Sequence, residues 1–428
     1  MMKRSFRRFR YTECDDFAKY LSSMASKGWH FKGWKMGMIF EKGEPEEIEY
    51  AVDVFGHASD MDIRPEANTK EFAEYCEVAG WKFIDSDKKF CVFQKIHEDA
   101  VDIVTPKERF ENASKAEMKA VLLRILGAVL LAGLYMDDFF SKRFPYTIFH
   151  YSLIVVTSVL VLQALYHILV GVKLAIWYQK TRKRVSYGEN IYLGIGEQKQ
   201  KKKDLGRYGL MVLMEMVILI ALYLDNDIGL VFPVMIALLF MILCMGGIAY
   251  SRPSRGEHVA SVIGVSVIVS IITIVIALGF SFWDGEIREK SEVPLLQEDY
   301  REVELSFDKA EVDKRENVFG GIEEYWVVYY EYDEETDEDY WDEISYRVFE
   351  SRYPVILNRI WNILKEGWVM PEDCTKLWGA EEAVADYEYF HSYYVRYEEQ
   401  IFVLEYEGNL TQEQVDIICK KMNLGQVK

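Results

Sequence analysis

One acidic residue lies in the middle of a long apolar stretch, where a charge is costly. Glu215 lies within the segment Leu213-Met214-Glu215-Met216-Val217. An ionisable side chain inside a membrane span commonly marks an ion or proton pathway, so Glu215 is the candidate functional residue of a transporter or channel. The alternative is a protonated Glu215 that forms a hydrogen bond to a neighbouring helix, because one lone carboxylate does not make a proton relay.

Four lysines precede this stretch, and they are the candidate lipid contacts of the chain. They are Lys199, Lys201, Lys202 and Lys203. Lysines beside a membrane attract anionic lipid headgroups at about 1 kcal/mol per charge. Positive residues also hold a loop on the cytoplasmic side during membrane insertion, and we favour this simpler interpretation of the cluster.

Two cysteines in the last third of the chain are the candidates for a disulfide. Cys374 and Cys419 are expected outside the cytoplasm, where a disulfide persists. Their spacing in the sequence does not show whether the two sulfur atoms lie close enough to bond. The N-terminal cysteines Cys14, Cys76 and Cys91 are expected to be cytoplasmic and reduced.

The remaining polar clusters predict neither a metal site nor a cofactor site. The acidic run Glu331–Asp339 offers oxygen ligands for Ca²⁺, but it lacks the spacing and the turn glycine of an EF-hand, so a solvated hairpin tip is expected. His57, Asp60 and Asp62 lie in a loop and could bind a metal ion, but a solvated turn is the expected structure. Gly194-Ile195-Gly196 lacks the third glycine of a dinucleotide fingerprint. Because no HExxH, GxSxG, Walker, kinase or CxxC motif occurs, we expect a protein that is not an enzyme.

Five apolar runs surround Glu215 and must position it. Each has about 17–25 residues, which is enough for a helix to cross a hydrocarbon core of about 30 Å. The runs are 120–136, 147–171, 208–224, 229–250 and 258–282. The sequence therefore predicts a multi-pass α-helical membrane protein with five spans, whose membrane domain covers residues 120–283.

The charges of the connecting loops predict the orientation in the cell membrane. Positive residues collect before the first run, between the second and third runs, and between the fourth and fifth runs. Because cytoplasmic loops carry the excess of lysine and arginine, we expect a cytoplasmic N-terminus. Five crossings then place the C-terminus outside the cytoplasm, and the lipid bilayer is the expected partner.

The segments outside the membrane domain are expected to fold as two α+β domains. Residues 1–102 form the cytoplasmic domain, 103–119 a linker helix, and 284–428 an extracytoplasmic domain. The net charge of the whole chain is −19, and the part after Phe282 carries about −22 by itself. A nucleic-acid partner is not expected, because phosphate binding requires basic surfaces.

The N-terminal domain shows an internal echo of a helix, a glycine, a tryptophan and two strands. Phe17-Ala18-Lys19-Tyr20 leads to Gly28-Trp29, and Phe72-Ala73-Glu74-Tyr75 leads to Gly80-Trp81. Glycine readily adopts the left-handed conformation that ends a helix, and either Asp15 or Asp16 can cap the start of the first helix. The sequence therefore predicts two similar halves, with helices on one face of a sheet.

These residues resemble the bacterial membrane-protein family catalogued as domain of unknown function 2812. The resemblance covers about the first hundred residues and rests on Lys27-Gly28-Trp29, on Phe40-Glu41-Lys42-Gly43-Glu44-Pro45-Glu46, and on Tyr75-Cys76-Glu77-Val78-Ala79-Gly80-Trp81. It carries over no catalytic residues, because the family has no established activity. It implies an accessory membrane protein, often encoded beside PadR-like regulators, with a stress- or envelope-linked role.

The expected function is therefore non-enzymatic. A cytoplasmic domain and an acidic extracytoplasmic domain joined through a bilayer suit a sensor, a signalling protein or an accessory subunit that contacts other membrane proteins. The alternative is a transporter or channel component that uses Glu215, which predicts polar faces and broken helices within the spans.

Overall fold

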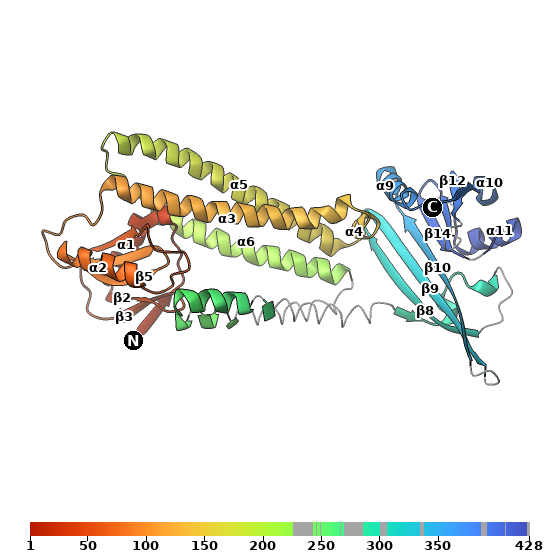
Figure 1. Cartoon of the computed structure of the whole chain (residues 1–428), viewed down its shortest axis with the longest axis horizontal. Helices are drawn as coiled ribbons and strands as arrows, with labels where there is room; N and C mark the ends of the chain where they lie inside the picture. Colours follow the sequence, from red (N-terminus) through yellow and green to blue (C-terminus); the bar gives the residue numbers. More distant parts are fainter. Residues whose placement is uncertain are drawn as a thin grey trace. The chain divides into compact units, whose positions relative to one another are not determined.

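A computed structural model describes most of the 428 residues (Figure 1). It covers 1–225, 243–244, 246–248, 250–265, 267–268, 286–299, 306–333, 338–386, 392–406 and 408–425. Some side chains between 197 and 219, between 286 and 291, and between 332 and 341 lie outside this description. Internal contacts divide the chain into two units, which are described separately. The first comprises 1–132, 158–219 and 228–277, and the second 133–157, 220–227 and 278–428.

The N-terminal domain consists of two halves, each with the order strand, helix, strand, strand. The first half contains β1 (Met2–Ser5), α1 (Cys14–Ala25), β2 (Trp29–Trp34) and β3 (Met38–Lys42). The second contains β4 (Tyr50–Val54), α2 (Ala67–Val78), β5 (Trp81–Asp87) and β6 (Phe90–Lys95). The sheets have the equivalent antiparallel orders β1-β3-β2 and β4-β6-β5. A short 3-10 helix, Tyr11–Glu13, precedes α1.

The burial of the two helices follows from this repeat. Gly28 and Gly80 follow α1 and α2 with positive φ angles of 76° and 89°, which a glycine adopts without steric cost. At equal distances before these glycines, Leu21 and Ala73 are both buried. The sequence echo aligned Phe17 with Phe72, whereas burial aligns Phe17 with Thr69, about one helical turn earlier.

Two long helices carry the apolar runs that follow this domain. They are α3 (Pro106–Phe140) and α5 (Tyr151–Ser186), with the short α4 (Phe144–Thr147) between them. Both are long and apolar enough to cross a membrane, and in each only 17% of the most apolar window is buried. Figure 1 shows them side by side, and Gly171 of α5 faces Ile125 and Val121 of α3. Leucines such as Leu126 and Leu130 remain exposed, which is typical of a lipid-facing surface and not of a soluble core.

The prediction of five spans is wrong. Among the described residues two helices qualify as membrane spans, α3 and α5. The first contains the predicted run 120–136, and the second contains residues 151–171 of the predicted run 147–171. The third run, 208–224, forms the second half of α6 (Glu197–Leu224), which is not one of this pair. The fourth and fifth runs, 229–250 and 258–282, lie largely outside the described residues. Apolar composition shows that a run tolerates lipid, and it does not by itself show that the run crosses a membrane.

The C-terminal domain is organised by an eight-stranded antiparallel sheet. Its order is β11-β12-β13-β14-β10-β9-β8-β7. The strands are β7 (Glu286–Arg288), β8 (Ser306–Asn317), β9 (Gly320–Asp333), β10 (Glu338–Glu350), β11 (Pro371–Asp373), β12 (Glu382–Asp386), β13 (Ser392–Arg396) and β14 (Gln400–Glu405). The helices are α9 (Pro354–Lys365), α10 (Thr375–Trp378) and α11 (Gln412–Lys421), with short 3-10 turns at Lys290–Glu292 and Gln297–Asp299. The fold class therefore combines apolar helices with three sheets.

Side chains of β14 alternate between two separate hydrophobic cores. Phe402 and Leu404 belong to the core that α11 covers. Ile401 and Val403 belong to the core that α9 covers. Since successive residues of a strand point to opposite faces, α9 and α11 pack on opposite faces of this sheet.

The turn between α3 and α5 is part of the same unit as this sheet. Phe149 is fully buried in the core beneath α9. The Asp225 carboxylate, just beyond α6, accepts hydrogen bonds from the backbone N–H groups of Tyr151 (2.7 Å) and Ser152 (2.6 Å). These are unpaired donors at the start of α5, so Asp225 caps that helix from a distant part of the chain.

Candidate functional site

A loop between α5 and α6 is bound to the start of α1 in the manner of a peptide ligand. The Asp15 carboxylate accepts a hydrogen bond from the backbone N–H of Leu193 (2.6 Å), and the backbone N–H of Asp15 donates one to the carbonyl of Leu193 (2.9 Å). Asp16 accepts the N–H groups of Ile195 (2.6 Å) and Gly196 (3.0 Å). Leu193 is fully buried in the core of the N-terminal domain. We call residues 192–196 the docked loop.

The sequence of the docked loop fits this binding mode. A Cβ atom at Gly194 would lie 2.6 Å from the Asp16 carboxylate carbon, and Gly196 has a φ of +87°. Glycine is therefore required at Gly194 for close approach and favoured at Gly196 for its backbone conformation. The Tyr192 hydroxyl donates a hydrogen bond of 2.6 Å to Asp16. Burial and this hydrogen bond raise the pKa of Tyr192, so the hydroxyl keeps its proton and acts as the donor.

Two further basic side chains bring helices to acidic residues of the same domain. Lys203 of α6 lies 2.7 Å from the carboxylate of Glu13, whose side chain is only 3% exposed. Arg109 of α3 contacts Asp53 (2.6 Å) and Asp15 (2.8 Å). Burial raises the pKa of Asp53, and the charge of Arg109 opposes that rise. Asp15 therefore holds both α3 and the docked loop.

Arg252 fills a site between the two halves of the domain. Its guanidinium donates to the carbonyls of Ile63 (2.5 Å), Trp34 (3.1 Å) and Ser86 (2.5 Å). It also pairs with the Asp85 carboxylate at 2.6 Å. The rigid fork of an arginine matches several acceptors at once, which a lysine ammonium cannot reproduce.

The Arg252 site depends on the bulges of β2 and β5. The pairing of β2 shifts between Phe31 and Gly33, and that of β5 shifts between Phe83 and Asp85. A Cβ atom at Gly33 would overlap the Asp85 side chain. The small residue on one bulge therefore makes room for the carboxylate on the other.

We call the acidic residues that make these contacts, taken together, the docking site of the N-terminal domain. Its acceptor carboxylates are Glu13, Asp15, Asp16, Asp53 and Asp85. They hold α3, the docked loop, α6 and the segment at Arg252. Each carboxylate is occupied by an amide, an ammonium or a guanidinium group, so the arrangement binds structural elements and is not set up for proton transfer.

The sequence alone did not identify these acidic residues. Either Asp15 or Asp16 was expected to cap the first helix, but the residue before α1 is Glu13, and its side chain makes no capping hydrogen bond. Two features of the sequence could have indicated the docking site. They are the pair of carboxylates in the first turn of α1 and the glycine-containing loop that matched no nucleotide motif.

The residues predicted for ion transport and for lipid contact do not form one site among the described residues. Glu215 lies on α6, and its side chain lies outside the description. Lys199 and Lys202 are exposed, Lys203 is paired with Glu13, and the side chain of Lys201 is not described. The lipid-contact prediction for this cluster therefore stays a prediction.

The structure also places the cysteines of the possible disulfide and the residues of the possible metal site. Cys374 and Cys419 both carry free thiols and both pack against the core beneath α11. Asp60 accepts a hydrogen bond from Tyr11 (2.6 Å), and Asp62 accepts one from the backbone of Ser59 (2.8 Å). Within the described residues no group of three His, Cys, Asp or Glu side chains is placed to hold a metal ion. Residues 334–337 of the acidic run lie outside that description.

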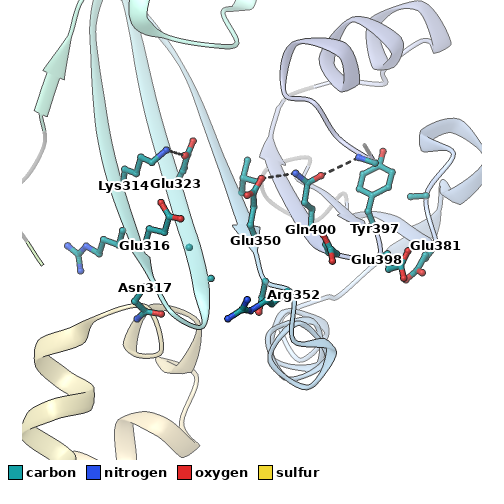
Figure 2. A pocket seen from close by; sticks show the side chains of 18 of the residues that line it. Lys314, Glu316, Asn317, Glu323, Glu350, Arg352, Glu381, Tyr397, Glu398 and Gln400 are labelled. Carbon is teal, nitrogen blue, oxygen red and sulfur yellow. Dashed lines mark hydrogen bonds and ion pairs between the residues drawn. The ribbon is translucent and has the colours of Figure 1, made fainter. Parts of the chain in front are cut away.

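The C-terminal domain contains an open groove of about 690 Å³. The turn between β8 and β9, the end of β10 and the turn between β13 and β14 line it (Figure 2). Lys314 pairs with Glu323, and Gln400 donates a hydrogen bond to Glu350 (2.7 Å). Glu398 and other acidic residues are exposed on the opposite wall. The groove is polar and of mixed charge, and nothing in it selects one class of ligand.

The fold and the docking site define a class of protein: an α+β docking domain attached to helices that are apolar enough to cross a membrane. Residues 13–126 match the family described as protein of unknown function (DUF2812), and the N-terminal part of the chain is a domain of this family. The match contains all five acceptor carboxylates and Arg109, whereas the docked loop, Lys203 and Arg252 lie beyond it. No curated protein and no solved structure matches the chain.

Proposed function

We propose that this chain is a non-enzymatic integral membrane protein, either a signalling protein or an accessory subunit, whose N-terminal domain responds to the position of the helices. The docking site is the observation that supports this proposal. Its five carboxylates bind four separate parts of the chain, and Asp15 binds two of these parts, α3 and the docked loop.

The energetics of buried charge favour coupled movement. Removing one partner of a buried ion pair leaves an uncompensated charge and commonly costs about 3–5 kcal/mol. Arg252 and Asp85 form such a pair, with side chains 17% and 10% exposed. The domain therefore stays bound to the segment at Arg252 until this ion pair breaks, and we propose that the other contacts of the docking site loosen with it.

We further propose that α3 and α5 cross the cell membrane as a helical hairpin, with the N-terminal domain in the cytoplasm and the α3–α5 turn outside. The C-terminal domain belongs to the same unit as this turn and lies outside with it, so the chain between α5 and the C-terminal domain crosses the membrane an odd number of times more. The exposed leucines of both helices support the crossing. The basic residues Lys180, Arg182, Lys183 and Arg184 at the end of α5 support a cytoplasmic position for that end.

Hydrogen exchange of the full chain in lipid nanodiscs tests the coupling. Arg252→Gln removes the four contacts of the guanidinium, and we expect exchange at the amides of Leu193, Ile195 and Gly196 to rise about tenfold or more, although none of them touches Arg252. Asp16→Asn is expected to raise exchange at Trp34, whose N–H binds Asp85 at 2.9 Å. Arg64→Gln, an exposed arginine of the same domain, is the control and should change neither.

Purely local effects would contradict the coupling. If Arg252→Gln affects only its own neighbours, and Asp16→Asn only the docked loop, the carboxylates are independent anchors. The domain would then be a rigid attachment and not a responsive one.

A further inference from the structure

The C-terminal domain is strongly acidic, yet one part of its surface is apolar and basic. This part consists of the β8–β9 turn and the start of α9, and we call it the α9 surface. Val318 is 59% exposed and Val355 is 79% exposed. The exposed side chains of Arg352, Tyr353 and Arg359 complete it.

The α9 surface is continuous with the turn that joins α3 to α5. Asn317 donates a hydrogen bond to the carbonyl of Ile148 (2.9 Å). Arg359 donates one to the carbonyl of Phe140 at the end of α3 (2.7 Å). All these residues belong to the second unit. The end of α3 and the α9 surface therefore lie next to each other, and both face either lipid or water.

The side-chain chemistry is typical of the boundary between lipid and water. The Arg352 guanidinium lies 5.0 Å from the ring of Tyr353, and that of Arg359 lies 6.0 Å from the ring of Phe144. Aromatic rings concentrate at this boundary because one end is apolar and the other is polar. Arginine binds phosphate groups through its planar fork of donors.

We propose that the α9 surface rests on the bilayer and binds the headgroups of anionic phospholipids. Val318 and Val355 enter the boundary region, while Arg352 and Arg359 contact lipid phosphates. The continuity with the end of α3 favours lipid over a second protein as the occupant. This inference rests on the proposed membrane crossing of α3 and α5.

Photo-crosslinking of the full chain in its native membrane tests the inference. A benzophenone amino acid replaces Val355, and mass spectrometry identifies the adduct. We expect phospholipid adducts, whereas the same probe at Glu413 should give none. Glu413 is the matched control because it is exposed on α11, which covers the opposite face of the sheet.

Reconstituted vesicles test the preference for anionic lipid. In equal mixtures of phosphatidylglycerol and phosphatidylcholine, we expect the Val355 probe to favour phosphatidylglycerol severalfold. The double variant Arg352→Gln/Arg359→Gln should remove this preference while adducts with lipid persist. Equal labelling of the two lipids in both proteins would overturn the role of the arginines.

A third probe separates this inference from the proposed membrane crossing. Leu130 is 64% exposed on α3, so a probe there should give lipid adducts if the helix crosses a membrane. Lipid adducts at Leu130 with protein adducts, or none, at Val355 would overturn the lipid-binding surface alone. An absence of lipid adducts at both positions would overturn both proposals.

Discussion

At the scale of single residues, the N-terminal domain uses buried charge to specify partners. A buried ion pair contributes little net stability, because desolvation offsets much of the attraction. It discriminates strongly, however, because a wrong partner leaves the charge unpaired. Arg252 satisfies one carboxylate and three carbonyls, and such a set of acceptors excludes almost any other side chain.

The thiol of Cys374 gives a prediction at this scale. Burial raises its pKa to about 11. At pH 8 about one thiol in a thousand is then ionised, so alkylation by iodoacetamide should be about 200-fold slower than for an ordinary cysteine. The rate should rise about tenfold for each pH unit up to about 11, as followed by mass spectrometry of the folded protein.

The denatured protein supplies the control for this prediction, since its thiols react normally. Reaction of native Cys374 at the denatured rate would show that the thiol is not buried. Burial also raises the pKa of Cys419. Because thiolates carry out disulfide exchange, a bridge between Cys374 and Cys419 should form slowly without a catalyst.

The docking residues show where sequence reasoning reaches its limit at this scale. Asp15 and Asp16 were visible as an acidic pair at the start of a helix, and that local role was the obvious one. Their hydrogen-bond partners lie almost 180 positions further along the chain. A local pattern contains no information about such a partner, so only the folded chain identifies the site.

At the scale of elements, the signals that worked were local ones. The glycines after α1 and α2 have the positive φ expected of a helix end. At the start of α11, the Thr411 side chain accepts the N–H of Gln414 in a capping box, which is a local pattern of the same kind. The strand β1, Met2–Ser5, was not predicted, because a short polar edge strand depends on pairing with β3 and has no pattern of its own.

The pairing of α3 with α5 gives a prediction at this scale. A Cβ atom at Gly171 would lie 2.9 Å from Ile125 and 3.6 Å from Val121. Gly171→Val should therefore force the helices apart and destabilise the pair by about 1–3 kcal/mol, as overpacking commonly does. The measurement is the midpoint of thermal unfolding of the full chain in nanodiscs.

Gly127→Val is the matched control, because no atom lies within 4 Å of a Cβ at Gly127. Both substitutions place the same side chain in an apolar helix, so they differ only in what the side chain meets. Equal midpoints for the two variants would show that α3 and α5 do not pack at Gly171.

At the scale of the whole molecule, composition predicted apolar helices and two α+β domains but gave the wrong number of spans. Hydropathy records whether a segment tolerates lipid, and it does not record whether the segment crosses a membrane. Among the described residues, α3 and α5 are the helices long and apolar enough to cross. The charges of the loops, by contrast, act while the chain inserts into the membrane. The orientation of the helices in the membrane is therefore tested by labelling and not by the folded structure.

Cysteine labelling in intact cells decides the orientation. The N-terminal domain contacts the start of α3 through Arg109, so both should lie on the cytoplasmic side. The C-terminal domain contacts the α3–α5 turn through Arg347 and Tyr146 (2.8 Å), so both should lie outside. Exposed cysteines introduced at Lys142 and Glu413 should react with a membrane-impermeant maleimide, and one at Glu74 only after permeabilisation. Labelling of all three in intact cells, or of Glu74 alone, would reverse or remove the proposed crossing.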